Sequence, residues 1–88
     1  MKPNAIIVDE KDNVAIALTD IAKGGTAVLK EGRTLVTKTD IPFSHKILLE
    51  DLSEGEEIIK YGEVIGKAST QLMQGEWIHS HNMESIGD

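Results

Sequence analysis

The 88-residue chain contains no cysteine, and its only aromatic residues are Phe43, Tyr61 and Trp77. The absence of cysteine excludes disulfides and thiolate metal sites, and it fits a reducing compartment. No apolar run approaches the roughly 20 residues that a membrane helix needs, and the apolar run at residues 5–8 is too short for a signal peptide. We therefore expect a cytoplasmic protein with no segment in a membrane.

Basic residues are also in the minority. Nine Lys and Arg residues stand against 15 Asp and Glu residues, which gives a formal net charge of −6. The basic residues are scattered and form no stripe, whereas a nucleic-acid-binding surface needs clustered Lys and Arg to replace the counterions on phosphates. We therefore expect no nucleic-acid partner. If the substrate is an anion, the charge of the whole chain repels it, and local Lys and His side chains must reverse that repulsion.

Short apolar runs separated by polar turns dominate the sequence. No segment keeps an apolar period of 3.6 residues over three helical turns, so the runs are typical of β-strands. The runs that we predict as strands cover residues 5–8, 14–18, 26–29, 34–37, 45–49, 57–60, 64–68 and 76–81. We predict a single all-β domain over residues 1–88, with an ordered core at about residues 5–83 and a loose polar tail from Asn82 to Asp88.

One pattern occurs three times between the predicted strands. It covers Asp20 to Gly24, Asp51 to Gly55, and Gln71 to Gly75. In each copy an apolar residue stands three positions before the glycine, and a strand follows. We interpret each copy as a one-turn helix that ends at glycine, whose apolar residue must reach a common core because such a helix is too short to be stable alone. The alternative is a chance similarity between turns, since glycine ends many of them.

The last half of the chain collects the scarce residue types. Residues 41–82 contain all three histidines and all three aromatic residues. A strand at residues 76–81 would place His79 and His81 on one face and Ser80 on the other. Two imidazoles beside the amide of Asn82 would form a small polar surface, which could hold a metal or a carboxylate, or could be a solvated strand end.

These residues support three kinds of chemistry. His79 and His81, with His45 as a third ligand, could bind a metal, although no Cys, Asp or Glu completes an obvious set. Lys46 and Lys60 could bind a carboxylate. His45 or His81 could act as an acid or a base. For each of these the alternative is an ordinary surface or hydrogen-bonded side chain, and we expect Trp77 to hold the final strand.

Six segments carry a resemblance to a known family. They are Asp-Asn-Val-Ala at 12–15, Ile-Pro-Phe-Ser-His-Lys-Ile at 41–47, Gly-Glu at 55–56, Lys-Tyr-Gly at 60–62, Ile-Gly-Lys-Ala at 65–68, and Gly-Glu-Trp-Ile-His-Ser-His-Asn at 75–82. Together they resemble the SAF domain, and more specifically the N-terminal domain of the altronate and galactarate dehydratase family. The resemblance covers roughly residues 5–83, and the His-Lys, Lys-Tyr-Gly and His-Ser-His-Asn segments are its most specific parts.

The resemblance implies a compact β-clip fold of short strands and a hydro-lyase activity. Such an enzyme removes water from a polyhydroxy acid to give a 2-keto-3-deoxy acid, and it requires iron(II). Long members of the family carry a large catalytic region after this domain, whereas in split members the domain is a separate small subunit. The resemblance therefore implies a small subunit that works with a large catalytic subunit, on which the iron would be held.

The resemblance also indicates where a sugar acid would bind. We expect the substrate site to include His45, Lys46, Lys60, Tyr61, His79, Ser80, His81 and Asn82. The closest alternative is the small subunit of sulfolactate sulfo-lyase, where sulfite leaves in place of water. An alternative of another class is a free-standing carbohydrate-binding or structural SAF module. A homo-oligomer is compatible with each of these functions.

Overall fold

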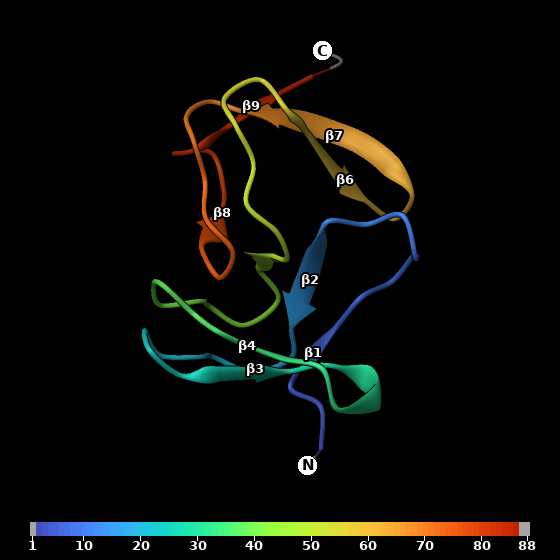
Figure 1. Ribbon diagram of the computed structural model, residues 1–88, viewed down its shortest axis with the longest axis vertical. Coiled ribbons are helices and arrows are strands. Elements are labelled where there is room, and N and C mark those ends of the chain that lie inside the picture. Colours follow the sequence, from blue (N-terminus) through green and yellow to red (C-terminus); the bar gives the residue numbers. More distant parts are fainter. Residues whose placement is uncertain (1, 87–88) are drawn as a thin grey trace.

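A computed structural model describes residues 2–86 and confirms the all-β prediction (Figure 1). In that range the chain forms nine short strands and a single 3₁₀ turn, η1 (Lys30–Gly32). The strands are β1 (Ala5–Ile6), β2 (Val14–Ala17), β3 (Thr26–Val28), β4 (Thr34–Val36), β5 (Lys46–Leu48), β6 (Glu57–Lys60), β7 (Glu63–Ala68), β8 (Trp77–Ile78) and β9 (Met83–Ser85). No helix within residues 2–86 is long and apolar enough to cross a membrane.

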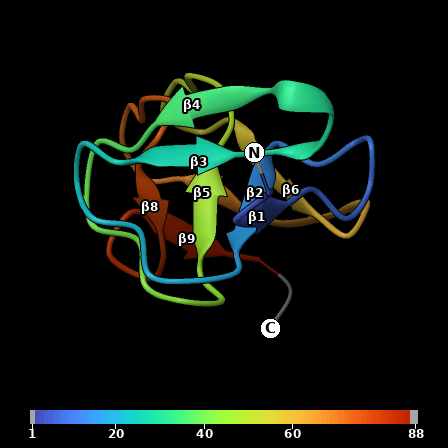
Figure 2. The ribbon, with the colours of Figure 1, turned by 90° about the horizontal axis from the view of Figure 1, so that it is seen from below.

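The strands form three antiparallel sheets. A four-stranded sheet has the order β1-β2-β5-β8, β3 pairs with β4, and the third sheet has the order β6-β7-β9. Figure 1 shows β6, β7 and β9 at one end of the molecule, β3 and β4 at the other, and the four-stranded sheet between them. Seen from below in Figure 2, β3 and β4 cross in front of the four-stranded sheet.

The four-stranded sheet divides the apolar interior into two clusters. Side chains alternate between the two faces of a strand, so neighbours in the sequence enter different clusters. Ala15 and Ile47 lie in the cluster shared with β3 and β4, whereas Val14 and Leu48 lie in the cluster shared with β6 and β7. Each half of the molecule thus has a small core of its own, and β2 and β5 contribute to both.

Each core is closed by one isolated antiparallel bridge. Ile21 pairs with Ile41 in one half, and Leu52 pairs with Leu72 in the other. All four side chains are buried. Ile21 and Leu52 stand 31 positions apart in the sequence, as do Ile41 and Leu72, and the same spacing relates β3 to β6 and β5 to β8. The fold therefore consists of two equivalent halves, in which β5 ends the first half and begins the second.

The predicted one-turn helices are wrong, because these segments form four-residue β-turns. The N–H groups of Gly25, His45, Glu56 and Glu76 donate to the carbonyls of Ala22, Pro42, Ser53 and Met73, at 2.8, 3.1, 3.0 and 3.2 Å. The third residue of each turn has a positive φ, which is 81° at Gly24, 68° at Ser44, 89° at Gly55 and 94° at Gly75. A positive φ at this position is typical of a type II turn, and it explains the recurrent glycine better than a helix end does.

The same turns show that the pattern occurs four times. The fourth copy is Asp40 to Ser44. It was not apparent in the sequence because Ser44 takes the place of the glycine. Four turns at equivalent places in two halves exclude chance similarity as the explanation of the pattern. The prediction that the apolar residue of each copy reaches the interior is confirmed for Ile21, Leu52 and Leu72.

The C-terminal segment also differs from the prediction. Met83–Ser85, expected in a loose tail, form β9 and pair with residues 66–68 of β7. Backbone pairing of this kind needs no apolar side chains, so the polar composition of the segment gave no indication of it. The end of the predicted tail, residues 87–88, lies outside the described residues.

Candidate functional site

The candidate site lies at one end of the four-stranded sheet, where β5 begins and β8 ends. Lys46, the first residue of β5, pairs with Ile78, the last residue of β8. His45 and His79 therefore stand immediately beyond the same end of two neighbouring antiparallel strands. This register brings together residues that lie more than 30 positions apart in the sequence.

Trp77 and His45 form the best-defined contact of the site. The indole Nε1–H of Trp77 donates to Nδ1 of His45 at 3.0 Å, and the two rings meet edge to face with centroids 5.5 Å apart. The indole also packs against the apolar cluster that contains Ile47. Trp77 thus packs β8, which was predicted as the last strand, onto the interior, and it also contacts a predicted site residue. The separation of 32 residues in the sequence left this pairing beyond the reach of sequence patterns.

His79 and His81 both lie against the indole. The imidazole of His79 stacks on Trp77 with an interplanar angle of 10° and a centroid distance of 5.5 Å. The centroid of His81 lies 5.0 Å from that of Trp77, and the centroid of His79 lies 5.0 Å from that of His45. The structure therefore brings the three histidines together around one indole, in agreement with a common site.

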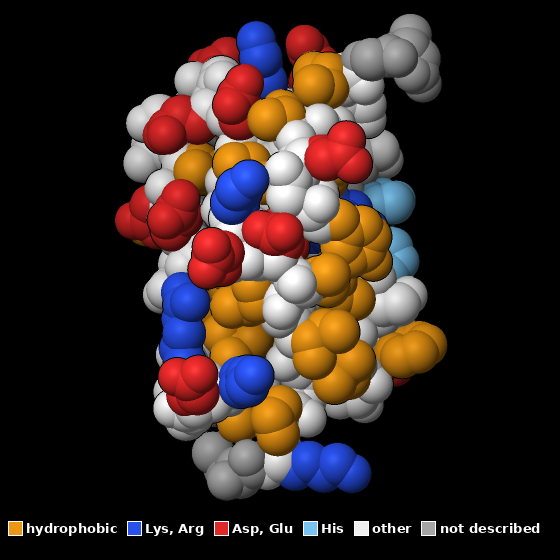
Figure 3. Space-filling model, turned by 90° about the vertical axis from the view of Figure 1, so that its right-hand side faces the viewer, with side chains coloured by type: hydrophobic (Ala, Val, Ile, Leu, Met, Phe, Trp, Pro, Cys, Tyr) orange, Lys and Arg blue, Asp and Glu red, His pale blue; other side chains and the backbone are white. Residues whose placement is uncertain are grey.

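The strand predicted at residues 76–81 is wrong at its end, because β8 stops at Ile78. Residues 79–82 form a turn, in which the N–H of Asn82 donates to the carbonyl of His79 at 3.1 Å. His79 and His81 hence flank the indole by way of this turn and not as alternate residues of a strand. Ser80 is exposed on the turn, and Figure 3 shows histidine side chains, in pale blue, at the surface along one edge of the molecule.

Asn82 stabilises this turn from inside. Its side chain is 5% exposed. Its Oδ1 accepts the N–H of His79 at 3.0 Å, and its Nδ2 donates to the carbonyl of Trp77 at 2.9 Å. A buried amide with both ends hydrogen-bonded has a structural role. We therefore do not include Asn82 among the groups that would contact a ligand.

Lys46 adds positive charge beside the histidine cluster (His45, His79 and His81), and Lys60 lies near Lys46. Burial and the nearby ammonium of Lys60 lower the pKa of Lys46 from its ordinary value. Tyr61 and Gly62, with φ of 57° and 78°, form the two-residue turn between β6 and β7, and Lys60 pairs with Glu63 across it. This turn places the Lys60 ammonium 4.8 Å from the centre of the exposed Tyr61 ring.

The electrostatics of the cluster favour an anion. His79 is exposed at its edge, but one of its faces stacks on Trp77, and loss of hydration is the main cause that lowers its pKa. Electrostatic interactions with His45, Lys46 and His81 lower the pKa of His79 further. All the charged neighbours that shift these two pKa values are basic. A bound carboxylate would relieve this mutual repulsion, in a chain whose net charge is negative.

A metal site is not complete in the residues that the structure describes. Within residues 2–86, no three His, Cys, Asp or Glu side chains are placed so that they could hold a metal ion together. In addition, Nδ1 of His45 already accepts the indole N–H. The arrangement of these residues therefore does not fit a self-contained iron site.

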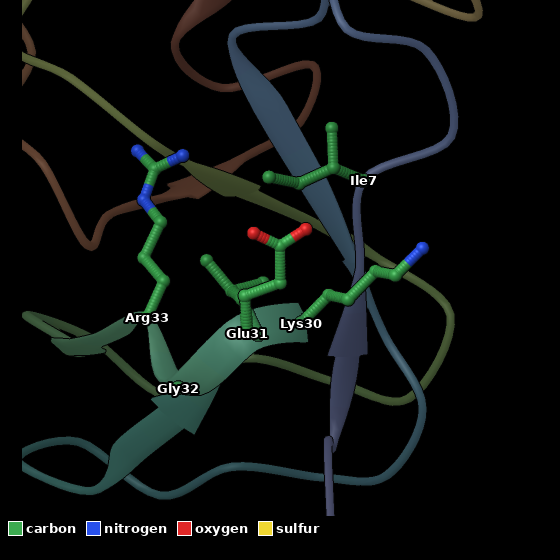
Figure 4. A pocket seen from close by; sticks show the side chains of 6 residues that line it. Ile7, Lys30, Glu31, Gly32 and Arg33 are labelled. Carbon is green, nitrogen blue, oxygen red and sulfur yellow. The ribbon is translucent and has the colours of Figure 1, made fainter.

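Two cavities occur away from the histidine cluster. One, of about 490 Å³, is lined by Ile7, Leu29, Lys30, Glu31, Gly32 and Arg33. Figure 4 shows the Glu31 carboxylate between the side chains of Lys30 and Arg33, so charges of both signs line this cavity. The other, of about 520 Å³, is lined by Asp20, Ile21, Ala22, Asp40, Ile41 and Pro42, and its two charged residues are both acidic. Neither cavity is lined by a residue of the predicted site.

Comparison with known proteins agrees with the resemblance. The family model described as altronate/galactarate dehydratase SAF domain matches residues 3–86. Altronate dehydratase of Escherichia coli strain K12 is 41% identical over 71 residues, which are 81% of this chain and 14% of that protein. Altronate dehydratase of Bacillus subtilis strain 168 is 41% identical over 80 residues, which are 91% of this chain and 16% of that protein. This chain thus spans about one seventh of the length of these two relatives.

A third relative has the same size as this chain. The alpha subunit of (2R)-sulfolactate sulfo-lyase from Chromohalobacter salexigens is 32% identical over 91 residues, and the match covers 97% of both chains. All three relatives carry the names of lyases. The chain therefore belongs to the altronate/galactarate dehydratase SAF domain family.

Proposed function

We propose that this chain is the small, substrate-binding part of a hydro-lyase that removes water from a sugar acid. In this proposal a large catalytic subunit, resembling the remainder of altronate dehydratase, carries most of the chemistry. The observation that carries the proposal is the cluster of basic side chains at the end of β5 and β8, in a chain whose relatives are lyases of hydroxy acids by name. The full-length match to a protein named as a subunit supports the two-component arrangement.

The cluster would bind the carboxylate of the sugar acid. Lys46 provides an ammonium group beside the imidazoles of His45, His79 and His81, and Lys60 provides a second one near Lys46. Charge-assisted hydrogen bonds to a carboxylate are about twice as strong as neutral ones. The exposed side chain of Ser80 lies on the turn between His79 and His81, and that of Tyr61 lies beside the Lys60 ammonium. In this proposal their hydroxyls would contact hydroxyl groups of the substrate.

Elimination of water next to a carboxylate requires a base for the α-proton and an acid for the leaving hydroxyl. As the α-proton leaves, negative charge develops on the carboxylate. Fixed ammonium groups at this carboxylate stabilise that charge more strongly in the transition state than in the ground state, and this is how a binding subunit would contribute to the rate.

The family resemblance implies iron(II). Because the described residues do not fit an iron site, we propose that iron is held by the large subunit and that this chain closes over the substrate from the other side. His79 and His81 would then lie near the metal without forming a ligand set of their own. We also propose that the complex works in the cytoplasm, in line with the absence of cysteine.

A second candidate function is supported by one specific observation. The sulfolactate sulfo-lyase subunit matches along its whole length, whereas the altronate dehydratases match over a small part of theirs. Sulfolactate also presents a hydroxy carboxylate, so the same basic cluster would hold it while sulfite leaves in place of water. A free-standing carbohydrate-binding module is the remaining alternative.

The test is purification of the tagged chain from its native cells, followed by assays with altronate, galactarate and sulfolactate in the presence of ferrous iron. We expect a large dehydratase-like chain to co-purify and the pair to form a 2-keto-3-deoxy acid, with no activity from the 88 residues alone. Release of sulfite from sulfolactate would favour the second candidate. If the chain purifies alone and inactive, the two-component proposal is wrong.

A further inference from the structure

We propose that Trp77 is a positioning residue that holds His45 as the neutral imidazole with its proton on Nε2. His45 would then offer an N–H donor to an oxygen of the bound acid and would not act as the base that removes the α-proton. The assignment of the substrate oxygen rests on the proposed function. The assignment of the proton rests on the geometry of the free chain alone.

The hydrogen-bonding capacities of the two rings determine which nitrogen of His45 carries the proton. An indole N–H can only donate, whereas each imidazole nitrogen either carries a proton or offers a lone pair. Because Nε1 of Trp77 lies 3.0 Å from Nδ1 of His45, Nδ1 must be the acceptor. The proton of the neutral imidazole is then on Nε2. A proton on Nδ1 would face the indole N–H and break this bond.

The backbone fixes both partners in place. The N–H of Trp77 donates to Oγ1 of Thr39 at 3.0 Å, and its carbonyl accepts the amide of Asn82 at 2.9 Å. The N–H of His45 closes the turn that begins at Pro42, and its carbonyl accepts the N–H of Ala17 at 3.0 Å. Groups held in this way by several hydrogen bonds lose little further entropy when they bind a ligand, which is the usual requirement of a preorganised site.

The rings that contact this pair are those of His79 and His81. Neither of these side chains is a carboxylate. Catalytic histidines that act as bases are commonly oriented by a carboxylate or carbonyl that accepts the Nδ1–H. His45 has the opposite arrangement, with a donor at Nδ1. A base supplied by this cluster would therefore have to be His79 or His81.

The test is nitrogen NMR of the ¹⁵N-labelled chain in mildly alkaline solution, which favours the neutral form of an imidazole. The chain has a single Trp, so its indole signal is unambiguous, and each of the three His signals is assigned by its disappearance in a His→Gln variant. We expect the His45 spectrum to show a protonated Nε2 and an unprotonated Nδ1. We also expect the indole N–H to resonate downfield and to exchange slowly with water.

Two variants test the pairing from each side. In His45→Gln the indole signal should move and its exchange with water should accelerate. In Trp77→Phe the Nδ1 signal of His45 should move towards the value of a free imidazole, and the second tautomer should appear. His81→Gln is the matched control, because it removes another ring from Trp77 but leaves the indole–imidazole bond, so the Nδ1 signal of His45 should change little.

A protonated Nδ1 in the wild-type chain would overturn the proposal, as would an indole signal that is the same in His45→Gln. If Trp77→Phe does not fold, the wild-type spectrum and His45→Gln still decide the matter. These experiments need no partner or substrate. A negative result would leave the small-subunit proposal intact, and a failure of that proposal would leave the tautomer result intact.

Discussion

Asn4 and Asn13 make the same four hydrogen bonds at equivalent places in the two halves of the protein. Asn4 uses its backbone N–H, its carbonyl and both ends of its amide to bind Val28, Leu18 and Thr26. Asn13 binds Ile59, Leu49 and Glu57 in the same manner. Each partner of Asn13 stands 31 positions after the matching partner of Asn4, but the two asparagines themselves do not have this spacing. The two halves are therefore equivalent not only in the residues that stand 31 positions apart, but also in the hydrogen bonds of the asparagines that precede β1 and β2.

The two asparagines should nevertheless differ in their effect on stability. Asn13 is 8% exposed, whereas Asn4 is half-buried. Asn13→Ala leaves the N–H of Ile59 without its partner at a part-buried position, and we expect a loss of about 1–3 kcal/mol in the free energy of unfolding. Asn4→Ala should cost less, because water can replace the lost bonds. Urea denaturation of both variants measures the difference, and equal losses would contradict this account.

Ser44 should be a site of backbone strain. Its φ of 68° is the conformation that glycine takes in the other three turns. A residue with a side chain is destabilised by about 1–2 kcal/mol in this region of φ. Glycine avoids this strain, but it also makes the unfolded chain more flexible, which cancels part of the gain in stability. We expect Ser44→Gly to raise the free energy of unfolding by about 0.5–1 kcal/mol.

Gly55→Ser is the matched control for this turn. A Cβ at Gly55 would meet no atom within 4 Å, so the change adds backbone strain without a clash. It should destabilise the protein by about 1 kcal/mol. If both changes destabilise the protein equally, the strain at Ser44 is absent. If Ser44→Gly stabilises the protein but lowers its activity in the complex, the serine is retained for function next to His45.

Asn82 should matter for the geometry of the site. Asn82→Ala removes the bonds to His79 and Trp77 inside the turn, and we expect a loss of about 1–3 kcal/mol together with a shift of the Trp77 indole signal. Ser80→Ala changes an exposed residue of the same turn and should leave both the stability and the indole signal almost unchanged. An indole signal that stays in place in Asn82→Ala would show that the turn does not position the indole.

The lowered pKa of His79 predicts a dependence of stability on pH. Between this lowered pKa and the ordinary value of 6.5, the unfolded chain binds a proton at residue 79 and the folded chain does not. The free energy of unfolding should therefore fall as the pH decreases through this window. The measurement is urea denaturation across the range, with the slope compared between wild type and His79→Gln. Ser80→Ala should keep the wild-type slope, and an unchanged slope in His79→Gln would contradict the prediction.

Much of the fold could be predicted from local sequence patterns. Each of the eight predicted apolar runs overlaps one of the strands β1–β8, because alternating burial and turn residues are properties of neighbours in the sequence. The Ser44 turn was missed because a serine, unlike a glycine, does not indicate a positive φ. The strand β9 was missed because its pairing is made by the backbone.

The structure brings together the three histidines that the sequence gathers in one half of the chain, but it does so by contacts that the sequence did not indicate. The contacts of these histidines depend on the register of β5 with β8. Trp77 was expected only to hold a strand, so its hydrogen bond to His45 was not predicted. The structural role of Asn82 follows from a turn that ends the strand early, and the apolar–polar pattern did not show that end.

The central claim is that the basic cluster holds the carboxylate of the substrate, and the kcat/KM of the complex with the large subunit tests it most directly. Lys46→Met keeps the aliphatic stem of this half-buried side chain and removes its charge. Lys30→Met is the matched control, since Lys30 lines the cavity that contains Glu31. We expect Lys46→Met to lower kcat/KM for the sugar acid by about ten- to a hundredfold, as for a lost hydrogen bond to a charged group, and Lys30→Met to change it little. Equal kcat/KM values in the two variants would contradict the account.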